Sequence, residues 1–187
     1  MKVIFLDIDG VLNTDETIDR IDDEYLKTGI EKIYIDEFRV EYLKQIVDMT
    51  DAKIVLSSSL RWRFKKVGDK CVARTKYASE FLNVFEKYGL FLYDITPNID
   101  NGSRQDEIRE WLSLNGNIDN FVILDDETVN LMDFVGNNLV VLNKLPVGQM
   151  VRDMKDSTGL CEHHIEEAIN ILNKRVQCKS LIKNVKN

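Results

Sequence analysis

The chain has 187 residues, 44% of them hydrophobic and 30% charged, which is the composition of a globular domain with one sizeable core. Its net charge of −7 excludes a protein that coats nucleic acid non-specifically, because that role needs a dominating positive field. The sequence has no apolar run of the roughly 18 residues needed to cross a membrane and begins without a signal sequence, so we expect a cytoplasmic protein with no membrane partner.

Short apolar runs alternate along the chain with segments whose apolar residues recur every three or four positions. In chain order, these patterns predict a strand at 3–6, a helix from 36, a strand at 53–57, a helix at 75–89, a strand at 90–96, a helix at 103–114, strands at 121–124 and 139–142, and a helix around 165–172. Because the strands are apolar throughout, they indicate an α/β fold of Rossmann-like type. We expect an open parallel sheet of about five strands with helices on both faces.

Two charged segments lie outside this alternation. Residues 14–35 are rich in Asp and Glu and predict a solvated loop or flap, while residues 174–187 predict a frayed basic tail. The intervals between the predicted strands leave little chain for a lid, so we expect a single domain over residues 1–187 without a large cap.

The first predicted strand runs directly into an acidic motif, Asp7-Ile8-Asp9-Gly10-Val11-Leu12-Asn13. Two carboxylates at a strand end repel each other unless a cation lies between them, and hard oxygen ligands suit Mg²⁺. An acidic surface turn is a common alternative, but it rarely follows four apolar residues. An EF-hand loop would need an acid where the chain has Val11 and a Gly where the chain has Leu12. The motif therefore predicts a Mg²⁺ site that contains Asp7 and Asp9.

This stretch resembles the first motif of the haloacid dehalogenase (HAD) superfamily of aspartate-nucleophile phosphatases. The resemblance implies that Asp7 attacks phosphorus and that Asp9 acts as general acid and base. Dehalogenation, the reaction that names the superfamily, is disfavoured because Asp9 has a role only when an oxygen leaving group must be protonated.

The strand at 53–57 ends in three serines, Ser57, Ser58 and Ser59. They resemble the second motif of the superfamily, a Ser or Thr that donates to a phosphoryl oxygen without adding charge. Ser57 follows the apolar run directly and is the predicted donor, with Ser58 as the alternative because strand ends are uncertain by a residue or two.

Arg104 lies in the first turn of its predicted helix, where the helix dipole disfavours a cation unless an anion also binds. It resembles the third motif, a Lys or Arg that holds the phosphoryl group. The strand at 121–124 ends in Asp125-Asp126 and resembles the fourth motif, which completes the metal site. We expect Asp126 to bind Mg²⁺ and Asp125 to support it, although the two roles could be exchanged. The resemblance covers about residues 2–143.

Arg61-Trp62-Arg63 follows the serines, so it is expected near the same edge of the sheet. An indole between two guanidinium groups could stack on a base and hold its phosphate, whereas the alternative is a helix start with solvated cations. The stretch 58–63, together with Gly159-Leu160, also resembles a small subgroup of the superfamily found appended to RNA-repair enzymes. His163-His164 is predicted to be a polar helix start, because adjacent helical residues point about 100° apart and cannot readily share a metal.

These features predict a Mg²⁺-dependent phosphatase that forms a phospho-aspartate. Its partner is a phosphorylated small molecule or, where the Arg-Trp-Arg stretch contributes, the phosphorylated end of a nucleotide or nucleic acid. The rival hypothesis is a non-catalytic regulator like a receiver domain, in which Asp7 is phosphorylated and read by another protein. Receiver domains, however, place their acidic pair and their phosphorylated Asp on different strands.

Overall fold

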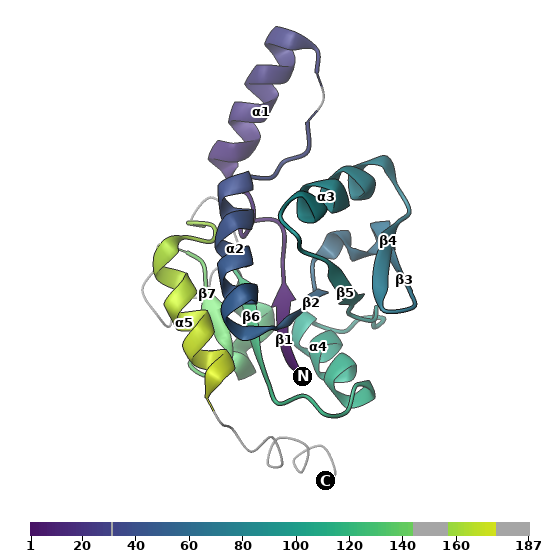
Figure 1. The fold of residues 1–187 in the computed structure, drawn as a ribbon, viewed down its shortest axis with the longest axis vertical. Coiled ribbons are helices and arrows are strands. Elements are labelled where there is room, and N and C mark those ends of the chain that lie inside the picture. Colours follow the sequence, from purple (N-terminus) through teal and green to yellow (C-terminus); the bar gives the residue numbers. More distant parts are fainter. Residues whose placement is uncertain (31, 144–156, 175–187) are drawn as a thin grey trace.

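The computed structural model describes residues 1–30, 32–143 and 157–174 (Figure 1). At its centre is a parallel sheet in the order β5-β2-β1-β6-β7. Its strands are β1 (Lys2–Leu6), β2 (Lys53–Leu56), β5 (Leu92–Ile95), β6 (Asn120–Asp125) and β7 (Leu139–Val141). The predicted fold class, an α/β Rossmann-like sheet of five strands, is confirmed.

Helices cover both faces of the sheet because the side chains of each strand alternate between two cores. Ile4 and Leu6 of β1 lie in the larger core with α2 (Glu37–Thr50), α3 (Lys76–Lys87) and α5 (Glu162–Asn173). Val3 and Phe5 face the smaller core, to which α4 (Arg104–Leu114) contributes Ile108 and Trp111. A 3₁₀ segment, η2 (Val129–Phe134), closes this second face.

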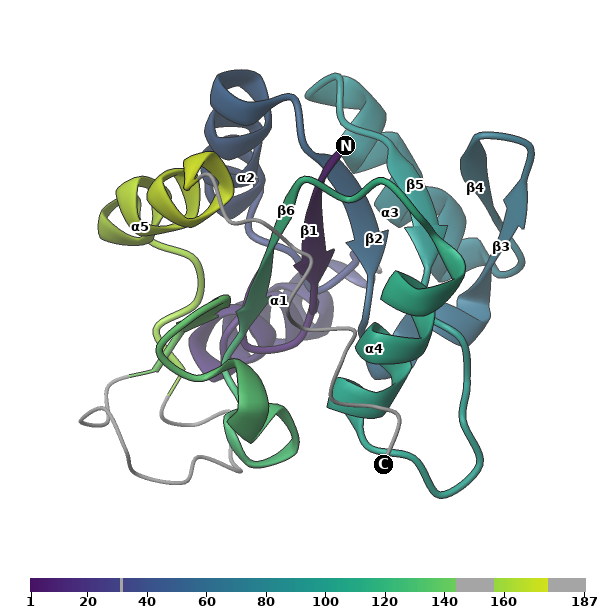
Figure 2. The same cartoon turned by 90° about the horizontal axis from the view of Figure 1, so that it is seen from below.

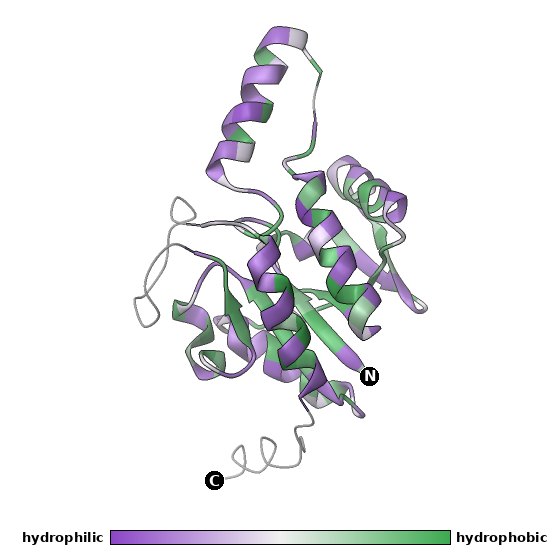
Figure 3. Ribbon diagram, turned by 60° about the vertical axis from the view of Figure 1, so that its left-hand side comes forward, coloured by the Kyte–Doolittle hydropathy of each residue, from purple (hydrophilic) through white to green (hydrophobic). Residues whose placement is uncertain are grey.

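The acidic segment 14–35, predicted as a loop or flap, is mostly a helix, α1 (Asp15–Thr28). It projects from the body of the molecule, and its residues are mainly hydrophilic (Figures 1 and 3). Its base is fixed by buried Asp36, which accepts hydrogen bonds from Thr17 and Arg20. Only Thr17 and Ile21 of the helix are buried, so the sequence offers no clear apolar stripe.

A second unpredicted element follows β2. The 3₁₀ segment η1 (Ser59–Arg63) leads into an antiparallel hairpin, β3 (Phe64–Val67) and β4 (Lys70–Ala73). The hairpin stands at the side of the sheet beyond the edge strand β5 (Figure 2). Among the described residues, α1 and this hairpin are the elements inserted between the strands and helices of the predicted fold. No large cap domain is present in this part of the chain.

The predicted basic tail lies outside the described residues except for Lys174. Within the described ranges, every helix is too short or too polar to span a bilayer.

Candidate active site

The carboxyl ends of three neighbouring strands bring the predicted motifs together. Asp7 follows β1, and its backbone N–H donates to the carbonyl of Leu124 in β6 at 3.1 Å. Ser57 follows β2, and its N–H donates to the carbonyl of Leu6 at 2.9 Å. Ligands of open parallel sheets bind at this edge. The backbone of the sheet therefore fixes the starting point of each motif.

Asp7, Asp125 and Asp126 form a buried acidic group. Their ligand atoms all lie within 4.8 Å of one another, and all three residues are buried. Burial raises the pKa of Asp126 to about 7, and the charges of Asp125 and Asp7 contribute to the rise. Burial also raises the pKa of Asp125. Three carboxylates packed this closely repel one another when charged, and their oxygens form a donor set that suits a divalent cation.

Arg104 is the cation of this group. It is the first residue of α4, whose N-cap Ser103 accepts from the Asp106 N–H, and its guanidinium donates to Asp7 at 2.5 Å and also to Asp125. Burial lowers the pKa of Arg104, but the charges of Asp125 and Asp7 outweigh burial and raise it well above the usual value. One guanidinium balances only one of three carboxylates, so the group can accept more positive charge.

The two aspartates of the β6 end have different environments. Asp125 is fully buried, and its carboxylate accepts from Arg104 and from the Glu127 N–H at 2.9 Å. Asp126 packs against Gly10, where an added Cβ would lie 2.3 Å from its carboxyl group. Gly10 also has a φ of +74°, so the turn needs glycine for its conformation and for this close approach. Asp125 is thus held by Arg104 and the backbone, whereas Asp126 packs on the turn of the first motif, and their ligand roles stay predictions.

Asp9 lies apart from the acidic group and is held by Asn13. The Asn13 amide donates to Asp9 Oδ1 and to the carbonyl of Tyr34, both at 3.0 Å, and its oxygen accepts from the Gly10 N–H at 2.9 Å. Burial raises the pKa of Asp9, while the hydrogen bond from Asn13 lowers it. The structure thus leaves the predicted metal-ligand role of Asp9 a prediction, and it adds Asn13, which the sequence analysis did not single out.

The serines differ in hydrogen bonding. Ser57 is fully buried, and its Oγ has no hydrogen-bond partner among the described residues. Ser58 instead caps η1, because its Oγ accepts from the Leu60 N–H at 3.2 Å. A buried hydroxyl without a partner is costly unless a ligand completes it. Of the two predicted donors, Ser57 is therefore the one whose hydroxyl has no protein partner among the described residues.

A family model described as "HAD domain in Swiss Army Knife RNA repair proteins" matches residues 3–147. The chain belongs to this family. No curated protein and no solved structure matches the chain. The predicted recognition, a HAD protein of the RNA-repair-associated subgroup, is confirmed. Membership of a HAD family supports a hydrolase of the phosphatase type.

In this HAD domain the Arg-Trp-Arg stretch has one exposed side chain, Trp62, between two partly buried arginines. Arg61 forms an ion pair with buried Glu107 and donates to the Ser58 carbonyl, so it braces η1 against α4. Trp62 is 58% exposed. The Arg63 guanidinium lies over the rings of Trp62 and Tyr77, at 4.7 and 5.0 Å from their centroids, and its charge lowers the pKa of Asp9. Trp62 is therefore the exposed member of the stretch, and the substrate-binding role of all three residues stays a prediction.

The segment that contains Gly159 and Leu160 packs against the backbone of the first motif. The Leu160 N–H donates to the Val11 carbonyl at 2.8 Å, and Ser157 Oγ donates to the Gly10 carbonyl. Arg39 packs so closely on Gly159 that a Cβ added there would lie 2.2 Å from its guanidinium, and Gly159 has a φ of +60°. This segment therefore holds the turn after Asp7 and Asp9.

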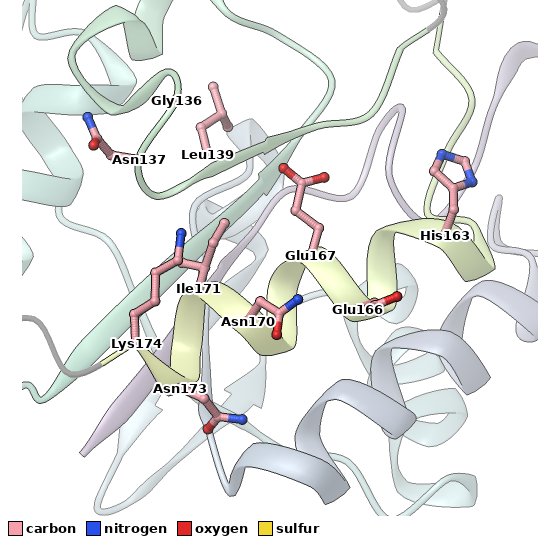
Figure 4. Close-up of a pocket in the computed structure, with 10 residues that line it drawn as sticks. All are labelled: Gly136, Asn137, Leu139, His163, Glu166, Glu167, Asn170, Ile171, Asn173 and Lys174. Atoms are coloured by element: carbon pink, nitrogen blue, oxygen red, sulfur yellow. The ribbon is translucent and has the colours of Figure 1, made fainter.

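Two other features contain none of the predicted site residues. Cys161, His163 and His164 lie within 4.8 Å of one another, but the guanidinium of Arg39 is 3.9 Å from the Cys161 sulfur and disfavours a cation. A pocket between β7 and α5 is lined by residues such as Leu139 and Glu167 (Figure 4). None of the predicted site residues lines it.

Proposed function

We propose that this HAD domain is a Mg²⁺-dependent phosphatase that hydrolyses phosphomonoesters through a phospho-aspartate on Asp7. The observation that carries the proposal is the buried group of Asp7, Asp125 and Asp126, which among the described residues has one cationic side chain, Arg104, for three carboxylates. The opposed receiver-like hypothesis lacks a role for Asp9 two residues after the nucleophile. In this proposal residues 1–187 form a single HAD-like domain.

The donor set fits a divalent ion. Asp7 and Asp126 would hold it, with Asp125 oriented by Arg104 and the Glu127 N–H. When bound, the ion would offset negative charge on the nucleophile and on the phosphoryl oxygens. Ser57 Oγ and Arg104 would hold the remaining phosphoryl oxygens, one by a neutral and one by a charge-assisted hydrogen bond.

Asp7 and Asp9 have different roles in the proposed reaction. An Asp7 oxygen bonds to phosphorus while the bond to the ester oxygen breaks, and that oxygen takes a proton from Asp9. In the second step Asp9 takes a proton from water, the water oxygen bonds to phosphorus, and the Asp7–phosphorus bond breaks to release phosphate. Burial, which raises the pKa of Asp9, favours the protonated form that the first step requires.

The favoured substrates in this proposal are terminal phosphates of nucleotides or nucleic acids. Support comes from the exposed indole of Trp62 and the adjacent Arg63, both on the segment that follows Ser57. The family description, which places this HAD domain in RNA repair proteins, agrees with that choice. Phosphorylated metabolites are the alternative class, and a panel of both would separate them.

Asp7→Asn tests the proposal. The amide is nearly isosteric with the carboxylate but cannot attack phosphorus, so phosphate release should fall by more than about 10³-fold while the fold is retained. A chelator should stop the wild-type reaction, and Mg²⁺ should restore it. Asp126→Asn should need more Mg²⁺ for half-maximal activity.

Activity of Asp7→Asn within tenfold of wild type would contradict the covalent mechanism. A wild-type protein that becomes phosphorylated on Asp7 by a small phosphodonor but never turns over would support the receiver-like regulator instead.

A further inference from the structure

Within the part of the chain that the structure describes, positive charge is concentrated in one short segment. Residues 61–76 contain seven Lys and Arg residues and one acid, Asp69, so the segment has a net charge of +6 in a chain whose total is −7. The segment consists of the end of η1, the β3–β4 hairpin and the start of α3. A local charge of this size in an acidic protein indicates a surface for an anionic partner.

The cationic side chains of the hairpin lie on two opposite faces. Phe64 and Cys71 are buried against the sheet, and side chains alternate along each strand. On the same inward face, Lys66 donates to Asp94 at 2.6 Å and lies over the ring of Tyr93. Lys66 is therefore an anchor that fixes the hairpin to β5.

Lys65 and Lys70 lie on the outer face of the hairpin. Arg74 continues this face just after β4, and its backbone N–H donates to the Arg63 carbonyl at 2.8 Å. All three side chains are exposed. Among the residues that the structure describes, no carboxylate pairs with any of them, whereas exposed Lys87 and Arg109 each form an ion pair. Three unpaired cations on one narrow ribbon repel one another, so this face gains from an anion that spans them.

The outer face begins beside the candidate active site. η1 is a single turn that connects Ser58 to the hairpin, and exposed Trp62 lies at the junction, where Arg74 also donates to its carbonyl at 3.5 Å. The hairpin then stands out at the side of the sheet (Figures 1 and 2). An exposed indole followed by a line of cations is the combination that binds unpaired bases and their phosphates.

We infer that the outer face of the β3–β4 hairpin, with Lys65, Lys70 and Arg74, docks the body of a single-stranded nucleic acid whose terminal phosphate lies at Asp7. This inference rests on the proposed function and adds a docking surface outside the reacting centre. Single strands are favoured over duplexes because every unpaired base offers a face to an aromatic side chain, whereas a duplex offers only the face of its last base pair. Affinity should therefore increase with strand length beyond the terminal nucleotide.

The test measures binding without turnover. In the Asp7→Asn protein, fluorescence anisotropy would follow labelled single strands of two and of about ten nucleotides, with the phosphate at either end. The hairpin variant Lys65→Ser/Lys70→Ser/Arg74→Ser is compared with Lys53→Ser/Lys87→Ser/Arg109→Ser, which removes the same charges from other surfaces. Thermal unfolding of each variant checks the fold.

We expect the hairpin variant to bind the longer strand at least about tenfold more weakly than wild type. The slope of log K against log salt should also become shallower by about 2, because each phosphate that the protein no longer neutralises removes about 0.7 from it. The control variant should change neither. Equal affinity and equal slope in the hairpin and control variants would overturn the inference. Competition by polyglutamate as effective as competition by the single strand would also overturn it, in favour of an acidic protein partner. Because the binding arm needs no catalysis, an absence of phosphatase activity would count against the proposed function alone.

Discussion

At the scale of single residues, the site depends on a few side chains with several partners each. Asn13 is the clearest case, because one amide contacts Asp9, Gly10 and the carbonyl of Tyr34. It thereby fixes Asp9, the proposed general acid, together with the turn of the first motif. Its neighbours in the motif, Val11 and Leu12, are fully buried, so a polar side chain here must be satisfied within the protein.

Asn13→Ala should lower kcat by about 10- to 100-fold, because hydrogen bonds to charged groups contribute about 1.5–3 kcal/mol. KM should change much less, since Ser57 and Arg104 keep their contacts with the phosphoryl group. Steady-state kinetics with a chromogenic phosphate ester would measure both constants. Asn115→Ala, which removes a similar amide from the end of α4, is the control. A change in KM with unchanged kcat would assign Asn13 to substrate binding instead.

Most of the site could be predicted because its residues stand at strand ends. Asp7, Ser57 and Asp125-Asp126 each follow an apolar run, and the rule for parallel sheets places such ends together. The role of Asn13 could not be predicted, because its partner Tyr34 is 21 residues later and returns only through the folding of segment 14–35. The inward turn of Arg61 likewise depends on Glu107, 46 residues away.

At the scale of elements, the predicted strands and helices were those with a continuous or periodic apolar pattern. The four residues of β3, Phe64–Val67, include only one buried side chain, so an apolar run is absent. The turn is a better sequence signal for the hairpin, because Gly-Asp between two short extended runs is typical of a two-residue hairpin loop. In the structure Gly68 has a φ of +62°. Burial by the neighbouring β5, not local propensity, makes this segment a hairpin.

The start of α5 predicts a pH-dependent stability. His164 Nδ1 accepts from the Cys161 N–H at 3.1 Å, and burial, with the charges of His163 and Arg39, lowers the pKa of His164 to about 4. The unfolded chain takes up the proton near pH 6.5, well before the folded protein does. Stability is therefore complete above about pH 6.5 and is lost as the pH falls toward 4.

Urea unfolding at several pH values would measure this effect. The free energy of unfolding should decrease by up to about 3 kcal/mol between pH 6.5 and 4 through His164. His164→Gln should reduce the dependence over this range, whereas the exposed neighbour His163→Gln should change it little. An unchanged pH dependence in His164→Gln would show that His164 is not the titrating group.

At the scale of the whole molecule, the described part of the chain leaves the catalytic edge without a separate cap domain. Helix α1 projects from the top of the molecule and the hairpin stands at its right-hand side in Figure 1. A site without a closing domain cannot exclude water around a small substrate by closure. It must gain affinity from contacts beyond the phosphate, or from a substrate that covers the cleft.

Trp62 is the residue that separates these two classes of substrate. Its indole is 58% exposed, so Trp62→Ala removes little packing from the protein but takes away the stacking surface for a terminal base. Stacking on an aromatic side chain contributes about 1–3 kcal/mol per base, so kcat/KM for a phosphorylated oligonucleotide should fall by about 5- to 150-fold. Hydrolysis of p-nitrophenyl phosphate and of sugar phosphates, which lack a base, should be nearly unchanged.

Added salt should raise KM for the oligonucleotide more than for p-nitrophenyl phosphate, because only the former has phosphates outside the reacting centre. Phe91→Ala, which removes an aromatic side chain of 60% exposure far from the serines in sequence, is the matched control. If wild type hydrolysed oligonucleotide ends and sugar phosphates with equal kcat/KM, and if Trp62→Ala changed neither, the indole would have no part in substrate choice. The catalytic edge would then serve a general phosphatase of small molecules, and its affinity would have to come from Ser57, Arg104 and the metal site alone.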